Sequence, residues 1–283
     1  MPSSTATLLL SCPDRPGIVA AVAGFLLEEG ANIVHADQHV DREEDLFLQR
    51  VEFDLEGIDL DELTGRFERI ATEFGMRWSL RTSTEPTRVA VLVSRQPHCL
   101  IDLLGRWEMG ELPGTPVAVI SNHPDHADLV AHFDVPYHHL PVEPGRRAAQ
   151  EARLLEALDD AGADLVVLAR YMQILSPAVV DAHPNRIINI HHSFLPAFAG
   201  GRPYHQAHER GVKVIGATAH YVTAELDEGP IIEQDVTRVS HRDEVPDLVQ
   251  KGRDLEKVVL ARAVRAHLEH RVLVYRNRTA VFA

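Results

Sequence analysis

The sequence predicts a two-domain α/β protein, in which a small βαββαβ unit precedes a larger unit with a doubly wound, mostly parallel sheet. Three observations predict this organisation. The chain has 283 residues, which is more than one average domain. The pattern of apolar segments changes near residue 88, and a polar, proline-containing stretch over residues 83–87 separates the two patterns. We therefore predict a first domain over residues 1–83, a linker over 84–88 and a second domain over 89–283.

The first domain follows from the spacing of its apolar residues. Helical spacing of Ile18, Val22, Phe25 and Leu26 predicts a helix over residues 17–29, which Gly30 ends. Alternation of polar and apolar residues, or short apolar runs, predicts strands over residues 5–11, 33–40, 46–54 and 76–82. A second helix is predicted over residues 60–74. This order is ferredoxin-like, with two helices on one face of a four-stranded antiparallel sheet.

The second domain alternates short apolar strands with helices. We predict strands over residues 88–94, 116–121, 135–140, 165–169 and 187–190, and helices over 99–109 and 147–160. A strand pair, 213–222 and 231–239, surrounds the turn 225–230, and a long helix over 245–269 and a last strand over 272–275 follow. Such alternation indicates a Rossmann-like sheet with helices on both faces. Ligands of such sheets bind beyond the carboxyl ends of the strands.

The composition excludes several classes of function. A formal net charge of -14 disfavours nucleic acid as a partner, because binding phosphates needs clustered lysines and arginines. The 45% hydrophobic content is that of a globular protein and not of a membrane protein, and the apolar stretch 6–10 is too short for a signal peptide. The two cysteines, Cys12 and Cys99, have no secretory context, so we expect free thiols and a cytoplasmic location.

Histidines leave one alternative open. The chain has 17 of them, with adjacent pairs at residues 138–139 and 191–192, so a metallohydrolase is a rival reading. Neither an H-E-x-x-H nor a C-x-x-C spacing accompanies them. We therefore expect no metal site.

The densest group of polar residues lies at the end of the strand that is predicted to finish near residue 190. Asn189 and His191 are two residues apart in a strand, so their side chains share a face. An amide that donates a hydrogen bond and an imidazole that moves a proton suit a carbonyl that becomes tetrahedral. Each residue alone could be a satisfied core residue. A second polar cluster, residues 220–230, has three carboxylates beside a glycine-proline turn, and the fold could bring one of them to an imidazole.

These clusters carry a resemblance to a known family. Residues 89–266 resemble the catalytic domain of folate-dependent formyltransferases, in which Asn-x-His is followed by Ser-x-x-Pro and later by an Asp before Gly-Pro. The resemblance implies that Asn189, His191 and Asp227 are the catalytic trio. It also implies a pterin pocket lined by residues 170–175 and closed by the loop 220–227. The substrate contacts implied in this way are Arg170, Met172, Ile174, Leu175, Ser193, His220 and Thr223.

Within this family the sequence resembles the formyltetrahydrofolate deformylases, which carry an additional N-terminal unit. The glycinamide ribonucleotide transformylases have a glycine-rich phosphate loop after the first strand of this domain, whereas residues 94–100 contain no glycine and include Pro97. Residues 198–205 and 252–254 are also deformylase-like, although Gly201 stands where alanine is expected. The resemblance implies hydrolysis of 10-formyltetrahydrofolate to formate and tetrahydrofolate. That activity would supply formate for purine synthesis and balance one-carbon folate pools, with folate as the substrate and no cofactor.

The alternative is transfer of the formyl group to an amine acceptor such as glycinamide ribonucleotide, because Arg95 could still bind a phosphate through its side chain. A non-enzymatic amino-acid sensor is a more distant rival.

The N-terminal unit resembles an ACT domain, a small-molecule sensing module. Its loop 14–17 precedes a helix, whose free N–H groups and dipole favour a carboxylate ligand. The resemblance implies an amino-acid effector bound by Asp14, Gly17 and Asn32. The alternative is a capped turn in a domain that serves only dimerisation, and in either case we expect a homo-oligomer.

Overall fold

The computed structural model describes residues 4–143, 145–197 and 203–283, so part of the deformylase-like segment, including Gly201, lies outside the described residues. The chain forms two compact units. The first contains Met1–Pro86, His270–Tyr275 and Thr279–Ala283, and the second contains Thr87–Glu269 and Arg276–Arg278.

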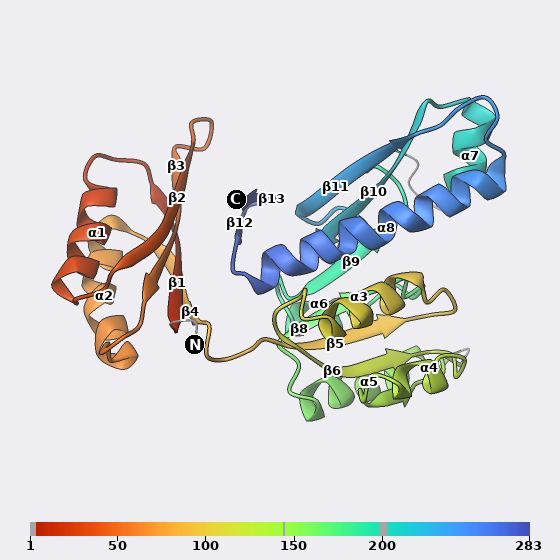
Figure 1. The fold of residues 1–283 in the computed structure, drawn as a ribbon, viewed down its shortest axis with the longest axis horizontal. Helices are drawn as coiled ribbons and strands as arrows, with labels where there is room; N and C mark the ends of the chain where they lie inside the picture. Colours follow the sequence, from red (N-terminus) through yellow and green to blue (C-terminus); the bar gives the residue numbers. More distant parts are fainter. Residues whose placement is uncertain (1–3, 144, 198–202) are drawn as a thin grey trace. The chain divides into compact units, whose positions relative to one another are not determined.

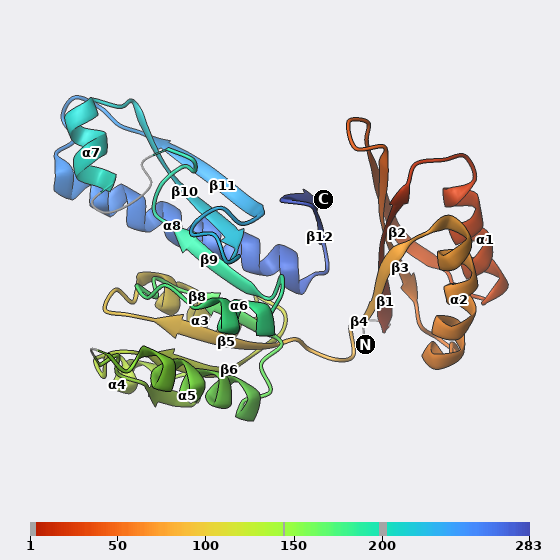
Figure 2. The ribbon, with the colours of Figure 1, turned by 180° about the vertical axis from the view of Figure 1, so that it is seen from behind.

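The first unit has the predicted ferredoxin-like arrangement (Figure 1). Its elements are β1 (Thr5–Pro13), α1 (Ile18–Glu28), β2 (Ile33–Asp41), β3 (Leu46–Asp54), α2 (Leu60–Phe74) and β4 (Arg77–Thr82). The antiparallel sheet has the order β2-β3-β1-β4. Both helices cover the same face of this sheet, as Figure 2 shows from behind. Phe67 of α2 joins the layers, because its ring lies 5.3 Å from that of Phe25 and 4.9 Å from that of Trp78.

The C-terminal hairpin belongs to the first unit and not, as predicted, to the second. It consists of β12 (Val272–Tyr275) and β13 (Arg278–Val281), of which the sequence predicted only the first strand. Leu273 and Phe282 are buried in a cluster with Leu48 of β3. Arg50 Nε donates to the His270 carbonyl at 3.0 Å. The physical reason for the difference is burial, because these apolar side chains are covered by the first unit's sheet.

The second unit has the predicted doubly wound sheet. Its strands are β5 (Arg88–Val93), β6 (Thr115–Ser121), β7 (Tyr137–His139), β8 (Leu165–Leu168), β9 (Ile187–His191), β10 (Val214–Tyr221) and β11 (Ile231–Arg238). Its helices are α3 (His98–Glu108), α4 (Ala127–Ala131), α5 (Arg147–Asp160), α6 (Pro177–Ala182), α7 (Pro203–Arg210) and α8 (Val245–Leu268). The order is β11-β10-β9-β8-β5-β6-β7, and β9, β10 and β11 pair antiparallel while the other neighbours pair parallel.

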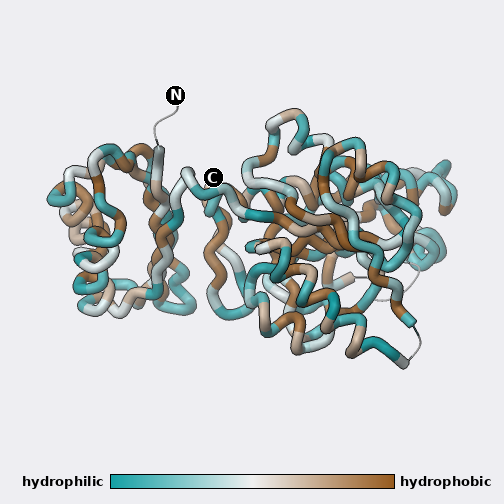
Figure 3. The backbone as a smooth tube through the Cα atoms, turned by 90° about the horizontal axis from the view of Figure 1, so that it is seen from below, coloured by the Kyte–Doolittle hydropathy of each residue, from teal (hydrophilic) through white to brown (hydrophobic). Residues whose placement is uncertain are grey.

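The central strands of this unit are apolar on both sides, which Figure 3 shows as a brown centre between mixed helices. Ala90 and Leu92 of β5 pack in one core with α5 and α6. The alternate residues Val89, Val91 and Val93 are also fully buried, toward the opposite face. Burial on both faces explains why these strands read as continuous apolar runs.

The sheet contains a topological switch point beside β5. The chain runs from β5 outward through β6 to β7 and then crosses to β8, on the other side of β5. Loops that leave β5 and β8 at their carboxyl ends therefore diverge and leave a crevice.

Among the described residues, no helix is long and apolar enough to cross a membrane.

Candidate active site

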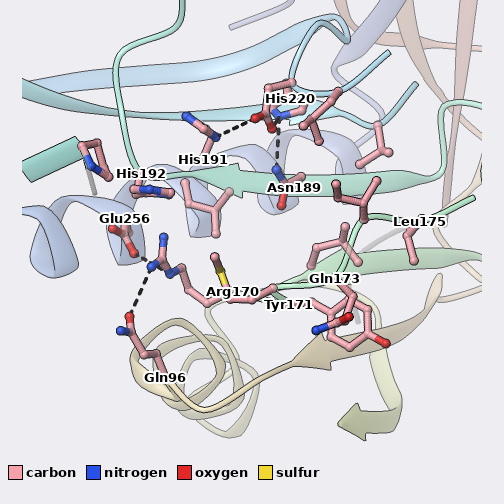
Figure 4. Close-up of a pocket in the computed structure, with 18 of the residues that line it drawn as sticks. Gln96, Arg170, Tyr171, Gln173, Leu175, Asn189, His191, His192, His220 and Glu256 are labelled. Atoms are coloured by element: carbon pink, nitrogen blue, oxygen red, sulfur yellow. Dashed lines mark hydrogen bonds and ion pairs between the residues drawn. The ribbon is translucent and has the colours of Figure 1, made fainter. Parts of the chain in front are cut away.

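A cavity of about 510 Å³ lies at the carboxyl ends of β8 and β9. All three predicted catalytic residues line it, and Figure 4 labels two of them, Asn189 and His191. Six of the seven predicted substrate contacts also line it: Arg170, Met172, Ile174, Leu175, His220 and Thr223. Ser193, the seventh, lies outside this lining, because its hydroxyl is used to donate to the Ala197 carbonyl at 2.7 Å and hold its own loop.

Strand pairing positions the imidazoles and the amide. The antiparallel register of β9 and β10 places Asn189 opposite His220 and His191 opposite Thr218. His191 is 5% exposed and His220 is 2% exposed. The sequence indicated that Asn189 and His191 share a face, but the pairing with His220 depends on a non-local register that no local pattern encodes.

Asp227 reaches the imidazoles from the turn that follows β10. Its backbone has φ of 57°, in the left-handed region that non-glycine residues rarely adopt. Gly229 lets this turn fold back, since a Cβ there would lie 1.8 Å from the Tyr221 carbonyl oxygen. The turn thus delivers a carboxylate in a strained backbone conformation, as functional sites often do.

The Asp227 carboxylate bridges two histidines. Its Oδ2 lies 3.3 Å from His191 Nδ1, and its Oδ1 lies 3.7 Å from His220 Nε2. Interactions with His191 and then with His220 hold the pKa of Asp227 well below its usual range, despite partial burial. The carboxylate therefore stays ionised at neutral pH.

His220 orients the amide of Asn189. Its Nδ1 lies 2.9 Å from the Tyr221 carbonyl oxygen, which can only accept, so Nδ1 carries the hydrogen. In this tautomer, Nε2 of His220 accepts from Asn189 Nδ2 at 3.2 Å. One amide N–H is thereby fixed, and the second is left for a ligand in the cavity.

His191 keeps its other nitrogen free for a ligand. Because Nδ1 faces the Asp227 carboxylate, it carries a hydrogen, and in this tautomer Nε2 presents a lone pair. Nε2 is buried and has no hydrogen-bond partner among the described residues. An unpaired buried nitrogen in a cavity is what a proton acceptor for a bound molecule requires.

One wall of the cavity is apolar although it faces solvent. Met172 and Ile174 are each 59% exposed, and Leu226, which also lines the cavity, is 61% exposed. The Met172 backbone N–H donates to Ser94 Oγ at 3.0 Å, which fixes the segment after β8. Exposed apolar side chains around a cavity mark a surface for an apolar ring.

The other end of the cavity holds a charged cluster that sequence reasoning missed. Glu256 of α8 is 1% exposed, accepts from Tyr204 Oη at 2.7 Å and lies 2.7 Å from His98 Nε2. Arg170 lies beside it, with Nε 3.5 Å from Glu256 Oε2, and its Nη2 donates to Gln96 Oε1 at 3.3 Å. Burial raises the pKa of Glu256, but these donors outweigh burial and lower it overall. The sequence feature that could have indicated this cluster is the carboxylate of Glu256 among the apolar residues that α8 buries.

The same cluster contains the group that comes nearest to a metal site in the described ranges. Donor atoms of His98, Cys99 and Glu256 lie within 4.8 Å of one another. Burial raises the pKa of the Cys99 thiol well above its usual range, which disfavours the thiolate that a metal needs. The neighbouring Arg170 guanidinium would also repel a cation. The donor set therefore fits a metal poorly.

The predicted effector site is divided in the structure. Asp14 and Gly17 line a cavity of about 570 Å³ at the start of α1, and Gly17 has φ of 98°. Asn32 does not line it, since its side chain donates to Asp54 Oδ2 at 3.1 Å instead. Gln38 and Val40 of β2 line the cavity in its place.

Comparisons with known proteins identify the families of both units. Residues 87–264 match the formyl transferase family, and residues 6–72 match the ACT domain family. The chain is 56% identical over its whole length to a formyltetrahydrofolate deformylase of Synechocystis sp., of which it covers 100%. It is 52% identical to the formyltetrahydrofolate deformylase of Bacillus subtilis, with 97% of this chain and 93% of that protein covered.

Solved structures give the same result. A formyltetrahydrofolate deformylase from Pseudomonas syringae pv. tomato superposes with a TM-score of 0.97 at 50% identity, covering 99% of this chain and 95% of that one. A glycinamide ribonucleotide transformylase from Symbiobacterium toebii superposes with a TM-score of 0.67 at 37% identity, over 70% of this chain and 95% of its own.

Proposed function

This chain belongs to the formyltetrahydrofolate deformylase family, and from that premise we propose that it hydrolyses 10-formyltetrahydrofolate to formate and tetrahydrofolate with Asn189, His191 and Asp227. One observation carries the assignment of residues. The buried, unpartnered Nε2 of His191 faces a cavity in which Asp227 orients the imidazole and His220 orients the Asn189 amide.

The substrate's bicyclic ring lies against the apolar wall. Exposed Met172 and Ile174, together with Leu175 and Thr223, would hold the pterin beside the segment that follows β8. The formyl group then lies near His191, between the apolar wall and the charged end.

In the chemical step, His191 Nε2 accepts a proton from a water molecule whose oxygen attacks the formyl carbon. The Asp227 carboxylate stabilises the imidazolium that forms. The free N–H of Asn189 and the imidazolium donate to the oxyanion. His191 then gives its proton to N10 as the C–N10 bond breaks. One water is consumed, and tetrahydrofolate, formate and one proton are released.

The test is formate release in the absence of any amine acceptor. Purified protein is supplied with 10-formyltetrahydrofolate, and formate is measured with formate dehydrogenase. We expect an acceptor-independent rate. Formate or formylated product that forms only after addition of glycinamide ribonucleotide or another amine would replace this assignment by the transferase alternative. The loop 94–97 between β5 and α3, which lacks glycine, supports the hydrolase.

We further propose that the reaction uses neither metal nor cofactor. The poor fit of the His98, Cys99 and Glu256 group to a cation supports this. Dialysis against a chelator should leave the rate unchanged, and loss of activity that zinc restores would contradict it.

The first unit is proposed to sense an amino acid. Asp14 and Gly17 at the start of α1 support a site for its charged groups, because α1 has no acidic residue in its first turn to occupy the helix N-terminus. Titration with glycine and with methionine, in calorimetry and in the rate assay, tests this. Heat that is absent for both, or unchanged in Asp14→Ala, would remove the proposal.

Three broader features are proposed on the same basis. A homo-oligomer is supported by β2, an edge strand with exposed Ile33 and Val34, and light scattering of the purified protein tests it. A cytoplasmic location is supported by the free thiols Cys12 and Cys99, and cell fractionation tests it. A supply of formate to purine synthesis follows from the reaction, and a deletion strain that formate rescues would support it.

A further inference from the structure

The charged end of the cavity contains donors that lack acceptors. Arg170 is 10% exposed at its side chain, and its Nη1 is buried without a hydrogen-bond partner in residues 4–143, 145–197 and 203–283. Arg253 Nε is unpartnered in the same way. Both side chains line the same cavity as the catalytic trio. Buried guanidinium N–H groups are costly to leave unpaired, so these donors point to a bound ligand.

The charges at this end indicate an anion. Arg170 and Arg253 contribute two positive charges, and Glu256 contributes one negative charge. Burial, and next the charge of Arg170, lower the pKa of His192 to about 4, so His192 is neutral at pH 7. The His98 ring is already engaged with Glu256. The guanidinium groups of Arg170 and Arg253 therefore outnumber the one carboxylate beside them, which favours a monoanion. The two other carboxylates that line the cavity, Glu225 and Asp227, lie on the turn between β10 and β11.

Glu256 also fixes where that anion can lie. Its two oxygens are occupied by His98, Tyr204 and Arg170, and its own negative charge repels a second carboxylate. Arg170 Nε faces Glu256 and Nη2 faces Gln96, so Nη1 is the donor left for a ligand (Figure 4). Because the side chains of Arg170 and Glu256 are only 10% and 1% exposed, an anion bound here is shielded from solvent.

The position of the Arg170 guanidinium relative to the reacting carbon limits which anion can be the ligand. The His192 ring stacks on the His191 ring with centroids 4.9 Å apart, and His192 senses the charge of Arg170. The Arg170 guanidinium and the catalytic imidazole are therefore both neighbours of His192. Hydrolysis makes a new anion beside the catalytic imidazole, because a carboxylic acid with a pKa of about 4 ionises at neutral pH. Transfer of the formyl group to an amine would make a neutral amide instead.

We propose that Arg170 Nη1 and Arg253 Nε form a subsite for the formate ion that hydrolysis releases. This inference rests on the proposed function, and it adds where the product is held and which residues hold it. A carboxylate could also come from the glutamate tail of folate, so the experiment compares both sources.

Binding is measured on the full chain without turnover. The probe is ¹³C-formate, whose NMR relaxation is followed with enzyme and tetrahydrofolate present, with chloride at matched ionic strength as the salt control. p-Aminobenzoylglutamate is titrated separately as the probe for the tail. The variants are Arg170→Gln and Arg253→Gln. The matched control is Arg153→Gln, an exposed arginine of α5 that does not line the cavity.

We expect formate binding to weaken about tenfold or more in each cavity variant, the range for a lost charge-assisted hydrogen bond, and to be unchanged in Arg153→Gln. In steady state, inhibition by added formate should weaken by the same factor. Formate binding that equals wild type in folded Arg253→Gln overturns the proposal, even if Arg170→Gln does not fold. So does weaker binding of p-aminobenzoylglutamate alone, which would assign the arginines to the folate tail.

The two proposals fail separately. Formate that binds through the two arginines in a protein without acceptor-independent hydrolysis contradicts the proposed function and leaves an anion site. Normal hydrolysis with formate binding that does not depend on either arginine contradicts only the subsite.

Discussion

Replacing Asp227 by asparagine tests the central interaction of the site. The change keeps the shape of the side chain and removes its charge. The lost charge-assisted hydrogen bond to His191 Nδ1, at 3.3 Å, is worth about 1.5–3 kcal/mol, or about 10- to 150-fold in rate. The asparagine amide can also donate to Nδ1, which moves the imidazole hydrogen to Nε2 and removes the base. A wrong tautomer of this kind costs about 10⁴-fold in a serine-protease triad. We therefore expect kcat to fall about a thousandfold or more.

The assay separates chemistry from binding. Formate release gives kcat and KM, and tetrahydrofolate titration gives the affinity of the variant for product. We expect both KM and product affinity within about threefold of wild type, because Asp227 acts on the transition state more than on the pterin. A normal kcat would refute the proposed site, and a large loss of folate affinity with unchanged kcat would make Asp227 a binding residue only.

A double variant tests whether Asp227 acts through His191. If it does, His191→Ala combined with Asp227→Asn should be no slower than the worse single variant, because the second change has little left to remove. Multiplicative losses would mean that the two residues serve separate steps. Asn189→Ala, which removes one donor to the oxyanion, should cost about a hundredfold or more in kcat.

Three further predictions concern the turn, acid stability and the hairpin. Gly229→Ala should lower kcat about a hundredfold, because its Cβ would overlap the Tyr221 carbonyl and displace the turn that carries the catalytic carboxylate. The rate of formate release measures this loss, and a normal rate would contradict the prediction. Burial lowers the folded-state pKa of His270 to about 4, below its ordinary 6.5, so its contribution to stability is complete above pH 6.5 and is lost as the pH falls to about 4. Urea unfolding of His270→Asn should therefore depend less on pH in that window, and an unchanged pH dependence would contradict it. Phe282→Ala should destabilise the first unit by about 3–5 kcal/mol, because Phe282 is buried against Leu48, and a urea midpoint equal to wild type would show that the hairpin does not contribute to the core.

Local sequence patterns predicted most of the helices and strands, but not which sheet the C-terminal hairpin packs against. Helical and alternating spacing indicated both helices of the first unit and its four strands, and the structure confirms the ferredoxin-like order. The position of the hairpin could not be predicted in this way, because the apolar residues Leu273 and Phe282 do not encode which sheet will bury them. Packing between residues more than two hundred positions apart is decided by which apolar surface remains open, and only the folded chain contains that information.

The same limit explains the site. Asn189 and His191 could be paired from the sequence because strand geometry is local, whereas the Asn189–His220 contact required the register of β9 against β10. Asp227 was placed by the family resemblance, and its strained backbone and dependence on Gly229 are properties of the turn as built.

Glu256 shows where a sequence signal existed and was not used. Helix α8 buries Leu248, Gly252, Glu256 and Val259, whose spacings of three and four residues define one stripe. A carboxylate on such a stripe must find donors when the helix packs, because an unpaired buried charge is too costly. Gly252 supplies the room for one of them, since a Cβ there would lie 2.0 Å from Tyr204 Oη. The glycine and the glutamate, one helical turn apart, are therefore parts of one arrangement, in which the space left by the first lets a hydroxyl reach the second. A glycine four residues before a carboxylate on an apolar helix face is a pattern from which this buried cluster could have been predicted.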